Sequence, residues 1–437
     1  MHFHVNWKLT MNAGRCDVDS AVSIEDILQL MLVCIFISNI HGIFMCGSYM
    51  YRLNSNMDKF YCAAIDKNLH IDGSNAYGVR LRPCCNYIPN KIYSNYTEYK
   101  SSKEIKEIEQ ATDWPRGCSF CKNAEMKNHI SPRQLANESL KDVGDVRYEL
   151  FPSNVCNLKC LMCDPKLSTA LAAEQHKLKI IDETYLKEYD QFSEMLEIVS
   201  TGPKADSISI IGGEFFLTKN NIEAMDYAID KQIPLRVVTN ATILLDAHLE
   251  KLRQIPKLEL QISCDGVESG YEFMRYPAKW DTFKNNSQEL ISTLKGQSIN
   301  IHFVLQALNA MYLIPTFDYF NKLKTKVRIT TLNEPYWLTF SILTDSEKSE
   351  LISLLDKQLN IYKLAKPQIE IVNKLKTHLG VVVTDPDNRN YAISRLNKTF
   401  RLRTLTKDTI QDQLGVYSQL CDELTRPEVV GDKIIGF

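Results

Sequence analysis

The sequence predicts an α/β fold built around a parallel sheet, and two observations support this prediction. From Val146 onward, short apolar segments typical of strands alternate with amphipathic segments typical of helices. The chain is also long enough, at 437 residues, and apolar enough, at 44% hydrophobic residues, to form a large core and more than one domain. Strands that alternate with helices are typical of βαβ units, whose strands pair in parallel.

The predicted elements follow one another in strict alternation. The strands are expected at 146–151, 206–211, 234–239, 257–263, 299–305 and 327–332, and the helices at roughly 166–200, 219–231, 243–254, 281–295 and 311–325. This period agrees equally well with a barrel and with a doubly wound sheet. In parallel α/β architectures the functional residues collect at the carboxyl ends of the strands, so these ends are the first places to examine.

The charge balance and the cysteine count narrow the class of protein. A formal net charge of −2 gives no indication of a nucleic-acid partner. Of 13 cysteines, eight lie between Cys62 and Cys163. An odd number of cysteines with tight spacings in a long chain argues against a secreted disulfide framework. Metal or cluster ligation in a reducing compartment fits better, and we therefore expect a cytoplasmic protein.

Three cysteines follow the first predicted strand in a C-x3-C-x2-C pattern: Cys156, Cys160 and Cys163. Structural zinc sites use four protein ligands and usually combine two C-x2-C pairs. Three thiols without an obvious fourth fit a cubane iron–sulfur cluster better, with one iron left open to a non-protein ligand. A zinc loop or unrelated thiols remain the competing interpretation of this motif taken alone.

Further polar residues stand at the ends of the next three strands. Gly212 and Gly213 would let a ligand approach the backbone closely, and the carboxylate of Glu214 beside them can bind an amine. Asn240 ends the third strand, where it can bind a ligand or cap the next helix. Ser263 and Asp265 end the fourth strand, where the alternative is a tight Asp-Gly turn.

Together these motifs resemble the signature of the radical S-adenosylmethionine (radical SAM) enzymes. The resemblance implies that Cys156, Cys160 and Cys163 hold a [4Fe-4S] cluster whose fourth iron is chelated by the amino and carboxylate groups of the SAM methionine. It also implies that Gly212, Gly213 and Glu214 hold the methionine amino group, although Phe215 stands where the family usually has proline.

The resemblance extends to the other strand ends and to the fold. It implies that Asn240 lies beside the SAM site and that Ser263 and Asp265 hydrogen-bond the ribose hydroxyls. Arg275, in a run similar to one found in the family, would meet the SAM carboxylate, a substrate anion or only a surface acid. The implied fold is a partial (β/α)6 TIM-like barrel over residues 143–335.

The implied activity is reductive cleavage of SAM at the cluster to a 5′-deoxyadenosyl radical, which abstracts hydrogen from a substrate. Family resemblance further implies an electron donor such as flavodoxin or ferredoxin. A peptide or protein substrate is expected by association, because fold and motif do not fix the substrate.

A cysteine-rich module is expected at residues 58–130. Cys62, Cys84, Cys118 and Cys121 could surround one metal or cluster, and Cys85 is an alternative to Cys84. The Asp-Gly pair between Cys62 and Cys84 predicts a hairpin. The arrangement resembles the twitch/SPASM auxiliary modules of radical SAM enzymes, which implies a second [4Fe-4S] cluster. Here the module precedes the barrel, whereas it usually follows it, and a four-cysteine zinc site is the rival interpretation.

The two ends of the chain are less informative. Residues 1–57 are expected to be an extension outside the functional domain. Within them, 27–51 is apolar and near the length that spans a bilayer, so a membrane anchor is the less favoured alternative. Residues 336–437 are expected to form a helical and extended region.

Two other functions remain as alternatives. A cysteine-rich zinc-binding interaction protein without redox catalysis would explain the thiols but not Gly212–Glu214 at a strand end. A degenerate SAM-binding regulator would explain the fold, but it would not need three intact cysteines.

Overall fold

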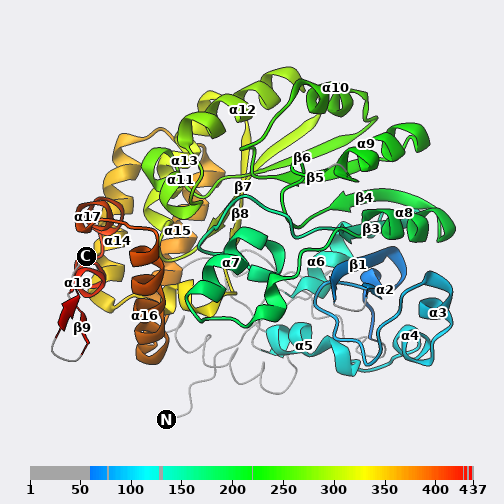
Figure 1. Ribbon diagram of the computed structural model, residues 1–437, viewed down its shortest axis with the longest axis horizontal. Coiled ribbons are helices and arrows are strands. Elements are labelled where there is room, and N and C mark those ends of the chain that lie inside the picture. Colours follow the sequence, from blue (N-terminus) through cyan, green and yellow to red (C-terminus); the bar gives the residue numbers. More distant parts are fainter. Residues whose placement is uncertain are drawn as a thin grey trace, which may run out of the picture. The chain divides into compact units, whose positions relative to one another are not determined.

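A mostly parallel, open sheet forms the core of the protein (Figure 1). The computed structural model describes residues 60–75, 78–126, 131–218, 220–426, 428–430 and 433–435. All of these except Phe60 belong to one compact unit, Tyr61–Phe437. The predicted extension 1–57 and its apolar segment 27–51 lie outside the described residues. Among the described residues, no helix is both long enough and apolar enough to cross a membrane.

The main sheet has eight strands in the order β2-β1-β3-β4-β5-β6-β7-β8. They are β1 (Asn68–Asn75), β2 (Gly78–Arg82), β3 (Val146–Phe151), β4 (Ala205–Ile210), β5 (Leu235–Thr239), β6 (Leu258–Ser263), β7 (Ser298–Leu305) and β8 (Lys326–Thr331). Every neighbouring pair is parallel except β1 and β2. The predicted α/β class is confirmed, and strands β3 to β8 are the six predicted strands.

Helices connect the strands and cover one face of the sheet (Figure 1). They are α7 (Thr169–Lys177), α8 (Phe192–Thr201), α9 (Asn220–Lys231), α10 (Asp246–Gln254), α11 (Glu268–Met274), α12 (Trp280–Thr293) and α13 (Leu313–Lys322). The single helix expected at 166–200 is wrong: α7 ends where Lys179 takes a φ of 56°, and α8 begins only at Phe192. The short helix α11 was not predicted.

The N-terminal part of the unit contributes two strands to this same sheet. The predicted hairpin is confirmed, because β1 and β2 pair antiparallel, and β1 also pairs in parallel with β3. The predicted place of its turn is wrong, because Asp72 and Gly73 lie within β1. Five short helices belong to this part of the chain: α2 (Ala63–Lys67), α3 (Tyr96–Ser101), α4 (Lys103–Glu109), α5 (Ser119–Met126) and α6 (Pro132–Ser139). The boundary between the cysteine-rich segment and the barrel stays a prediction.

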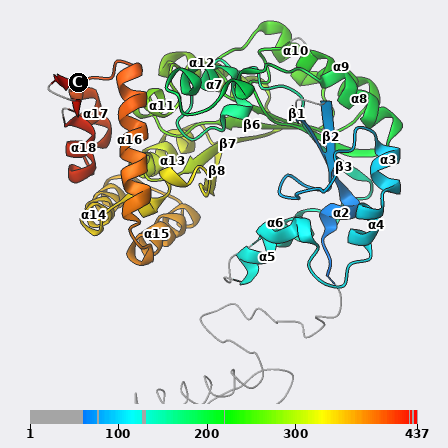
Figure 2. The ribbon, with the colours of Figure 1, turned by 60° about the horizontal axis from the view of Figure 1, so that its bottom comes forward.

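The C-terminal part is largely helical and packs beside α11 and α13 (Figure 2). Its helices are α14 (Asp345–Ile361), α15 (Lys366–Val381), α16 (Pro386–Leu402), α17 (Lys407–Leu414) and α18 (Ser418–Thr425), followed by a small ribbon of β9 (Glu428–Val430) and β10 (Lys433–Ile435). Arg389 of α16 and Glu347 of α14 form a buried ion pair at 2.7 Å that joins two of these helices.

Candidate functional site

The predicted site residues meet at the carboxyl edge of the sheet. The cysteine loop follows β3, Gly212–Glu214 follow β4, Asn240 follows β5 and Ser263 ends β6. Side chains from these four places line one cavity of about 190 Å³. Its lining includes Cys156, Cys160, Cys163, Gly212, Gly213, Glu214, Asn240, Ser263 and Arg275. Parallel strands bring segments far apart in the sequence to one edge, which is why the expectation from strand ends succeeds here.

The two glycines let the loop after β4 lie directly on the backbone that leads into the cysteine loop. Gly212 and Gly213 have φ values of +95° and +56°, which side chains rarely allow. A Cβ on Gly213 would lie 2.6 Å from the carbonyl oxygen of Val155. The amide of Glu214 donates to that same oxygen at 2.8 Å. The sequence therefore needs glycine here to bring Glu214 against the cysteine loop.

The Glu214 carboxylate is buried, and groups from the end of β5 hold it. Its Oε1 accepts from the Thr239 hydroxyl at 2.5 Å, and its Oε2 accepts from the Asn240 amide at 2.7 Å. Burial raises the pKa of Glu214, while these hydrogen bonds act in the opposite direction. The carboxylate is therefore fixed on the cavity wall between β4 and β5.

Asn240 links the end of β5 to the cysteine loop. Its Nδ2 donates to Asn157 Oδ1 at 3.1 Å, and its Oδ1 accepts from the Thr242 amide at 2.9 Å. Asn240 thus caps the turn after β5 and also lies on the cavity wall, while its predicted contact with a ligand stays a prediction. It does not cap helix α10, whose N-cap is Leu245.

Asp265 holds a neighbouring cation and is not among the residues that line the cavity. Its side chain is 0% exposed, its Oδ2 lies 2.6 Å from Arg275 Nη2, and its Oδ1 accepts from the Val304 amide at 2.7 Å. Arg275 in turn places Nη1 3.8 Å from Cys160 Sγ. Both oxygens of Asp265 are thus engaged, and its predicted ribose contact stays a prediction. Through Arg275, Asp265 acts on the cavity indirectly.

The three thiols of the loop would need a nearby cation, such as a metal ion, to stabilise their thiolate forms. Burial, and next the thiol of Cys160, raises the pKa of Cys156 to about 12. Burial and the other two thiols raise the pKa of Cys163 well above its usual value. Burial also raises the pKa of Cys160, against the nearby guanidinium of Arg275. Buried thiols of this kind ionise readily only beside a metal or another cation.

Three observations therefore support an iron–sulfur cluster here: the ligands are cysteines, burial raises their pKa values, and all three line the same cavity. Across the described part of the chain, no three His, Cys, Asp or Glu side chains are already arranged to hold a metal ion. Three sulfur donors, a carboxylate and a glycine backbone that line one cavity are the groups that a three-cysteine cluster and an amino-acid ligand would use.

A buried arginine from the C-terminal region braces the cysteine loop, and sequence reasoning missed it. Arg403 follows α16, and its Nη2 donates to the Lys159 carbonyl at 2.5 Å. The same nitrogen lies 2.7 Å from Glu174 Oε1 on α7, with both side chains 2% exposed. The guanidinium also lies 4.9 Å from the ring centre of Tyr276, whose carbonyl accepts from the Lys159 amide at 2.7 Å.

The predicted auxiliary thiols lie at the other edge of the sheet. Because β2 runs antiparallel, Cys84 just after it lies where the parallel strands begin, and Asn68 at the start of β1 donates to Pro83 O at 3.0 Å. Burial, and next Cys62 and Cys121, raises the pKa of Cys118 to about 12. Cys118 is therefore close enough to Cys62 and Cys121 to be influenced by them, while the binding of a metal or cluster by these thiols stays a prediction. Cys85 is exposed.

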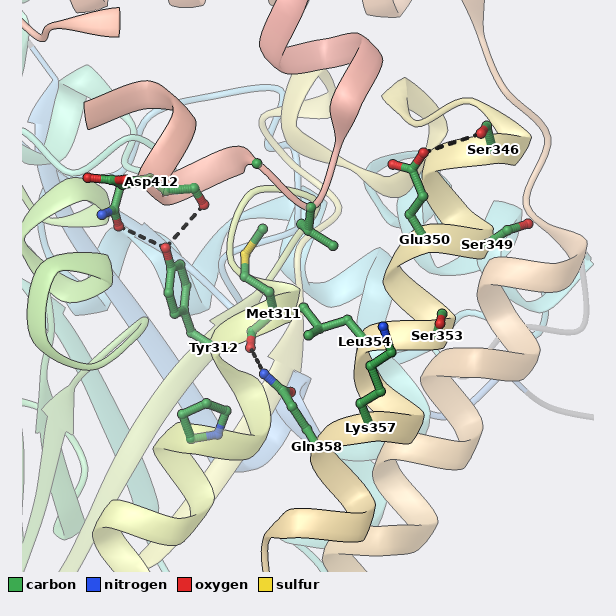
Figure 3. A pocket seen from close by; sticks show the side chains of 14 residues that line it. Met311, Tyr312, Ser346, Ser349, Glu350, Ser353, Leu354, Lys357, Gln358 and Asp412 are labelled. Carbon is green, nitrogen blue, oxygen red and sulfur yellow. Dashed lines mark hydrogen bonds between the residues drawn. The ribbon is translucent and has the colours of Figure 1, made fainter. Parts of the chain in front are cut away.

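A larger cavity, of about 840 Å³, lies between α13, α14 and α17 (Figure 3). Figure 3 shows Tyr312 directed at α17, where its hydroxyl donates to Gln413 Oε1 at 2.8 Å, and Gln358 directed at Met311, whose carbonyl accepts at 3.0 Å. None of the predicted site residues lines this cavity. Side-chain chemistry, rather than cavity size, therefore identifies the candidate site.

Comparison with known families agrees with this geometry. Residues 150–318 match the model of the radical SAM superfamily. This part of the chain is a radical SAM domain. The domain includes the cysteine loop and the ends of β4, β5 and β6. It does not fix the substrate or the specific reaction.

Solved structures of radical SAM enzymes resemble the chain distantly. anSMEcpe with bound AdoMet has 17% identity and a TM-score of 0.36, over 49% of this chain and 60% of that chain. Streptococcus suis SuiB has 15% identity and a TM-score of 0.32, over 62% and 63%. The methyltransferase TsrM from Kitasatospora setae has 11% identity and a TM-score of 0.33, over 46% and 39%. The chain thus matches less than two thirds of each structure. No curated protein matches the sequence.

Proposed function

We propose that this protein cleaves SAM reductively at a [4Fe-4S] cluster held by Cys156, Cys160 and Cys163. The observation that carries the proposal is the single cavity in which these thiols meet Glu214 and Ser263 from other strand ends. When bound, the cluster and SAM would supply a 5′-deoxyadenosyl radical, which abstracts hydrogen from the substrate.

The protein's own residues would position these groups. In this proposal Gly212, Gly213 and Glu214 receive the methionine amino group, and Asn240 and Ser263 face the nucleoside. Arg275 holds a positive charge beside Cys160: burial opposes this charge, but Asp265 and Cys160 outweigh burial and raise the pKa of Arg275. The guanidinium therefore stays protonated and can meet the SAM carboxylate.

We propose a peptide or protein as the substrate and flavodoxin or ferredoxin as the electron donor. Among the similar structures, SuiB is solved with the precursor peptide SuiA and anSMEcpe with the Cp18Cys peptide. Those complexes describe those proteins, and they make a peptide the first class of substrate to test here. A cytoplasmic location follows from the need for reduced thiols.

The deciding experiment measures iron, sulfide and zinc in anaerobically reconstituted protein, together with dithionite-driven release of 5′-deoxyadenosine from SAM. We expect nucleoside release and roughly eight irons per chain, as two four-iron clusters require. About four irons and one zinc, with release, would keep the enzyme and make the N-terminal thiols a zinc site. Zinc without release would instead favour the zinc-binding interaction protein.

We also propose that Cys62, Cys84, Cys118 and Cys121 hold the second cluster. Replacing Cys118 with alanine should then remove about four irons per chain while some SAM cleavage persists, because the cysteine loop at the other edge of the sheet is untouched. Iron analysis and nucleoside release measure the two effects separately. The control is Cys85→Ala, which removes an exposed thiol from the same segment. Unchanged iron in Cys118→Ala would show that this thiol is not a cluster ligand.

A further inference from the structure

The face of the sheet that points away from the covering helices is polar along most of its width. On the opposite face, apolar side chains such as Tyr148, Leu150 and Ile208 are buried in the core. The alternate positions carry Arg147, Glu149, Ser207, Ser209, Arg236, Glu259, Gln261, Asn300, His302 and Arg328, which the strand registers place side by side. Parallel α/β barrels normally fill this inner face with branched apolar residues. A polar inner face indicates that something other than core packing occupies it.

A cavity of about 530 Å³ lies on this inner face near the amino ends of the strands. We call it the arginine pocket and define it by five of its lining residues: Arg147, Ser209, Arg236, Glu259 and Arg328. It contains none of the residues that line the cysteine cavity. The two cavities thus lie toward opposite ends of the strands.

The arginine pocket carries more positive than negative charge. The single carboxylate of Glu259 faces two guanidiniums, with Arg328 Nη1 at 3.2 Å and Arg236 Nε at 3.8 Å. Arg147 has its own partner, since its Nη2 lies 3.1 Å from Glu149 Oε1. Three guanidiniums therefore share two carboxylates.

Arg236 lies at the centre of this group. Burial lowers the pKa of Arg236, Glu259 and Glu149 raise it, and Arg147 and Arg328 lower it further. Its Nη2 donates to Gln261 Oε1 at 2.6 Å. A half-buried guanidinium between like charges, such as that of Arg236 with its side chain 32% exposed, is stabilised by any further anion, and its planar donors suit a carboxylate.

A second observation points to a ligand in the same place. Ser209 lines the pocket and is 2% exposed. Within the described part of the chain, no group forms a hydrogen bond with its hydroxyl oxygen. Buried polar groups nearly always have a partner, so this hydroxyl indicates that a polar ligand binds beside Arg236, opposite which Ser209 lies in the β4–β5 register.

We propose that the arginine pocket binds a carboxylate of the substrate and so selects an acidic peptide. This inference rests on the proposed function and names the substrate class that it leaves open. Arg236 and Arg328 would supply the charge, and Ser209 would donate a further hydrogen bond to the carboxylate.

The length of β5 sets the distance from this anchor to the reacting atoms. Arg236 and Asn240 are four residues apart along the strand and its end, which corresponds to about 13 Å at roughly 3.3 Å per residue. An extended peptide covers that distance in about four residues. The peptide carbon that reacts is therefore expected three to four residues from the carboxylate that the arginine pocket holds.

The test is binding of short peptides to the reconstituted protein with SAM, measured by calorimetry without turnover. The probes are tetraglutamate and tetraglutamine, each with a blocked or a free C-terminal carboxylate. We expect blocked tetraglutamate, but not blocked tetraglutamine, to bind wild-type protein. Binding of tetraglutamine only with a free C-terminus would assign the pocket to a terminal carboxylate rather than an acidic side chain.

Two variants and one control locate the binding. Arg236→Gln should weaken tetraglutamate binding at least tenfold, and Ser209→Ala, which removes one hydroxyl and leaves every ion pair intact, should weaken it several-fold. Arg253→Gln makes the same change in charge on the outer helix α10, where the side chain is 53% exposed, and should leave binding unchanged.

Several outcomes would overturn the inference: no tetraglutamate binding by wild type, equal binding of the blocked glutamate and glutamine peptides, or an equal loss in Arg253→Gln. The measurement is independent of the proposed function. Nucleoside release without selective peptide binding would refute only the arginine pocket. Selective binding without nucleoside release would refute only the SAM chemistry.

Discussion

Replacing Cys160 with alanine is expected to abolish SAM cleavage and to remove the iron of one cluster. Cys160 is 8% exposed and lies in the middle of the loop, with Sγ 3.8 Å from Arg275 Nη1. A cluster with one iron reserved for SAM needs all three thiolates, so two remaining cysteines cannot hold it in place. We expect about four fewer irons per chain and nucleoside release at least a thousandfold below wild type, measured by iron analysis and chromatography.

The matched control for this variant is Cys421→Ala. Cys421 is also buried, at 1% exposure, and lies on α18, where its thiol donates to Gln411 Oε1 at 3.1 Å. The same atoms are removed at a comparable depth, so any general cost of deleting a buried thiol appears in both variants. Iron and cleavage should stay at wild-type levels in the control. Nucleoside release that survives in Cys160→Ala would refute the assignment of the cysteine loop.

The parts of the site that the sequence could predict are those that depend on local order. Cys156–Cys163 and Gly212–Glu214 directly follow strands that their own composition reveals, and parallel pairing then brings these ends together. The arginine pocket also had a local signal, because polar residues alternate in Ser207-x-Ser209 and Glu259-x-Gln261, the period of a strand with one polar face. The ends of the strands alone do not reveal this inner face.

Other parts depend on contacts between distant segments, and no short pattern encodes them. The pairing of β1 with β3 joins strands more than 70 residues apart, so nothing near Asn68 indicates it. Asp265 reads locally as a turn or ligand residue, and only the fold shows that its carboxylate holds Arg275. Arg403 contacts Lys159 from 244 residues away. The fold determines which distant residues meet in this way, and the periodicity of the sequence does not indicate such contacts.

The second large effect is expected from Arg403→Met, which should lower the free energy of unfolding by about 3–5 kcal/mol. The substitution leaves the Glu174 carboxylate buried without its guanidinium and removes the donor to the Lys159 carbonyl. Methionine keeps much of the side-chain volume, so the main cost is electrostatic. Urea unfolding of the cluster-free protein, followed by circular dichroism, measures the change. Arg253→Met, on the exposed face of α10, should change stability by no more than about 0.5 kcal/mol.

A double substitution separates two costs of Arg403→Met: the buried Glu174 charge that loses its guanidinium, and the packing contacts that the Arg403 side chain made. In Arg403→Met the buried Glu174 carboxylate keeps only Lys159 Nζ, 3.8 Å from its Oε2, as a cationic partner. Adding Glu174→Gln removes this poorly compensated charge, so the double variant should be more stable than Arg403→Met alone. If the effects of the two substitutions on the free energy of unfolding simply add, the ion pair does not stabilise the fold.

The link to function is the Lys159 carbonyl, which lies between Cys156 and Cys160 in the loop. If Arg403 positions that loop, reconstituted Arg403→Met should lose iron to a chelator faster than wild type, whereas Arg253→Met should not. Equal rates of iron loss in all three proteins would show that Arg403 stabilises the fold but does not position the cysteine loop.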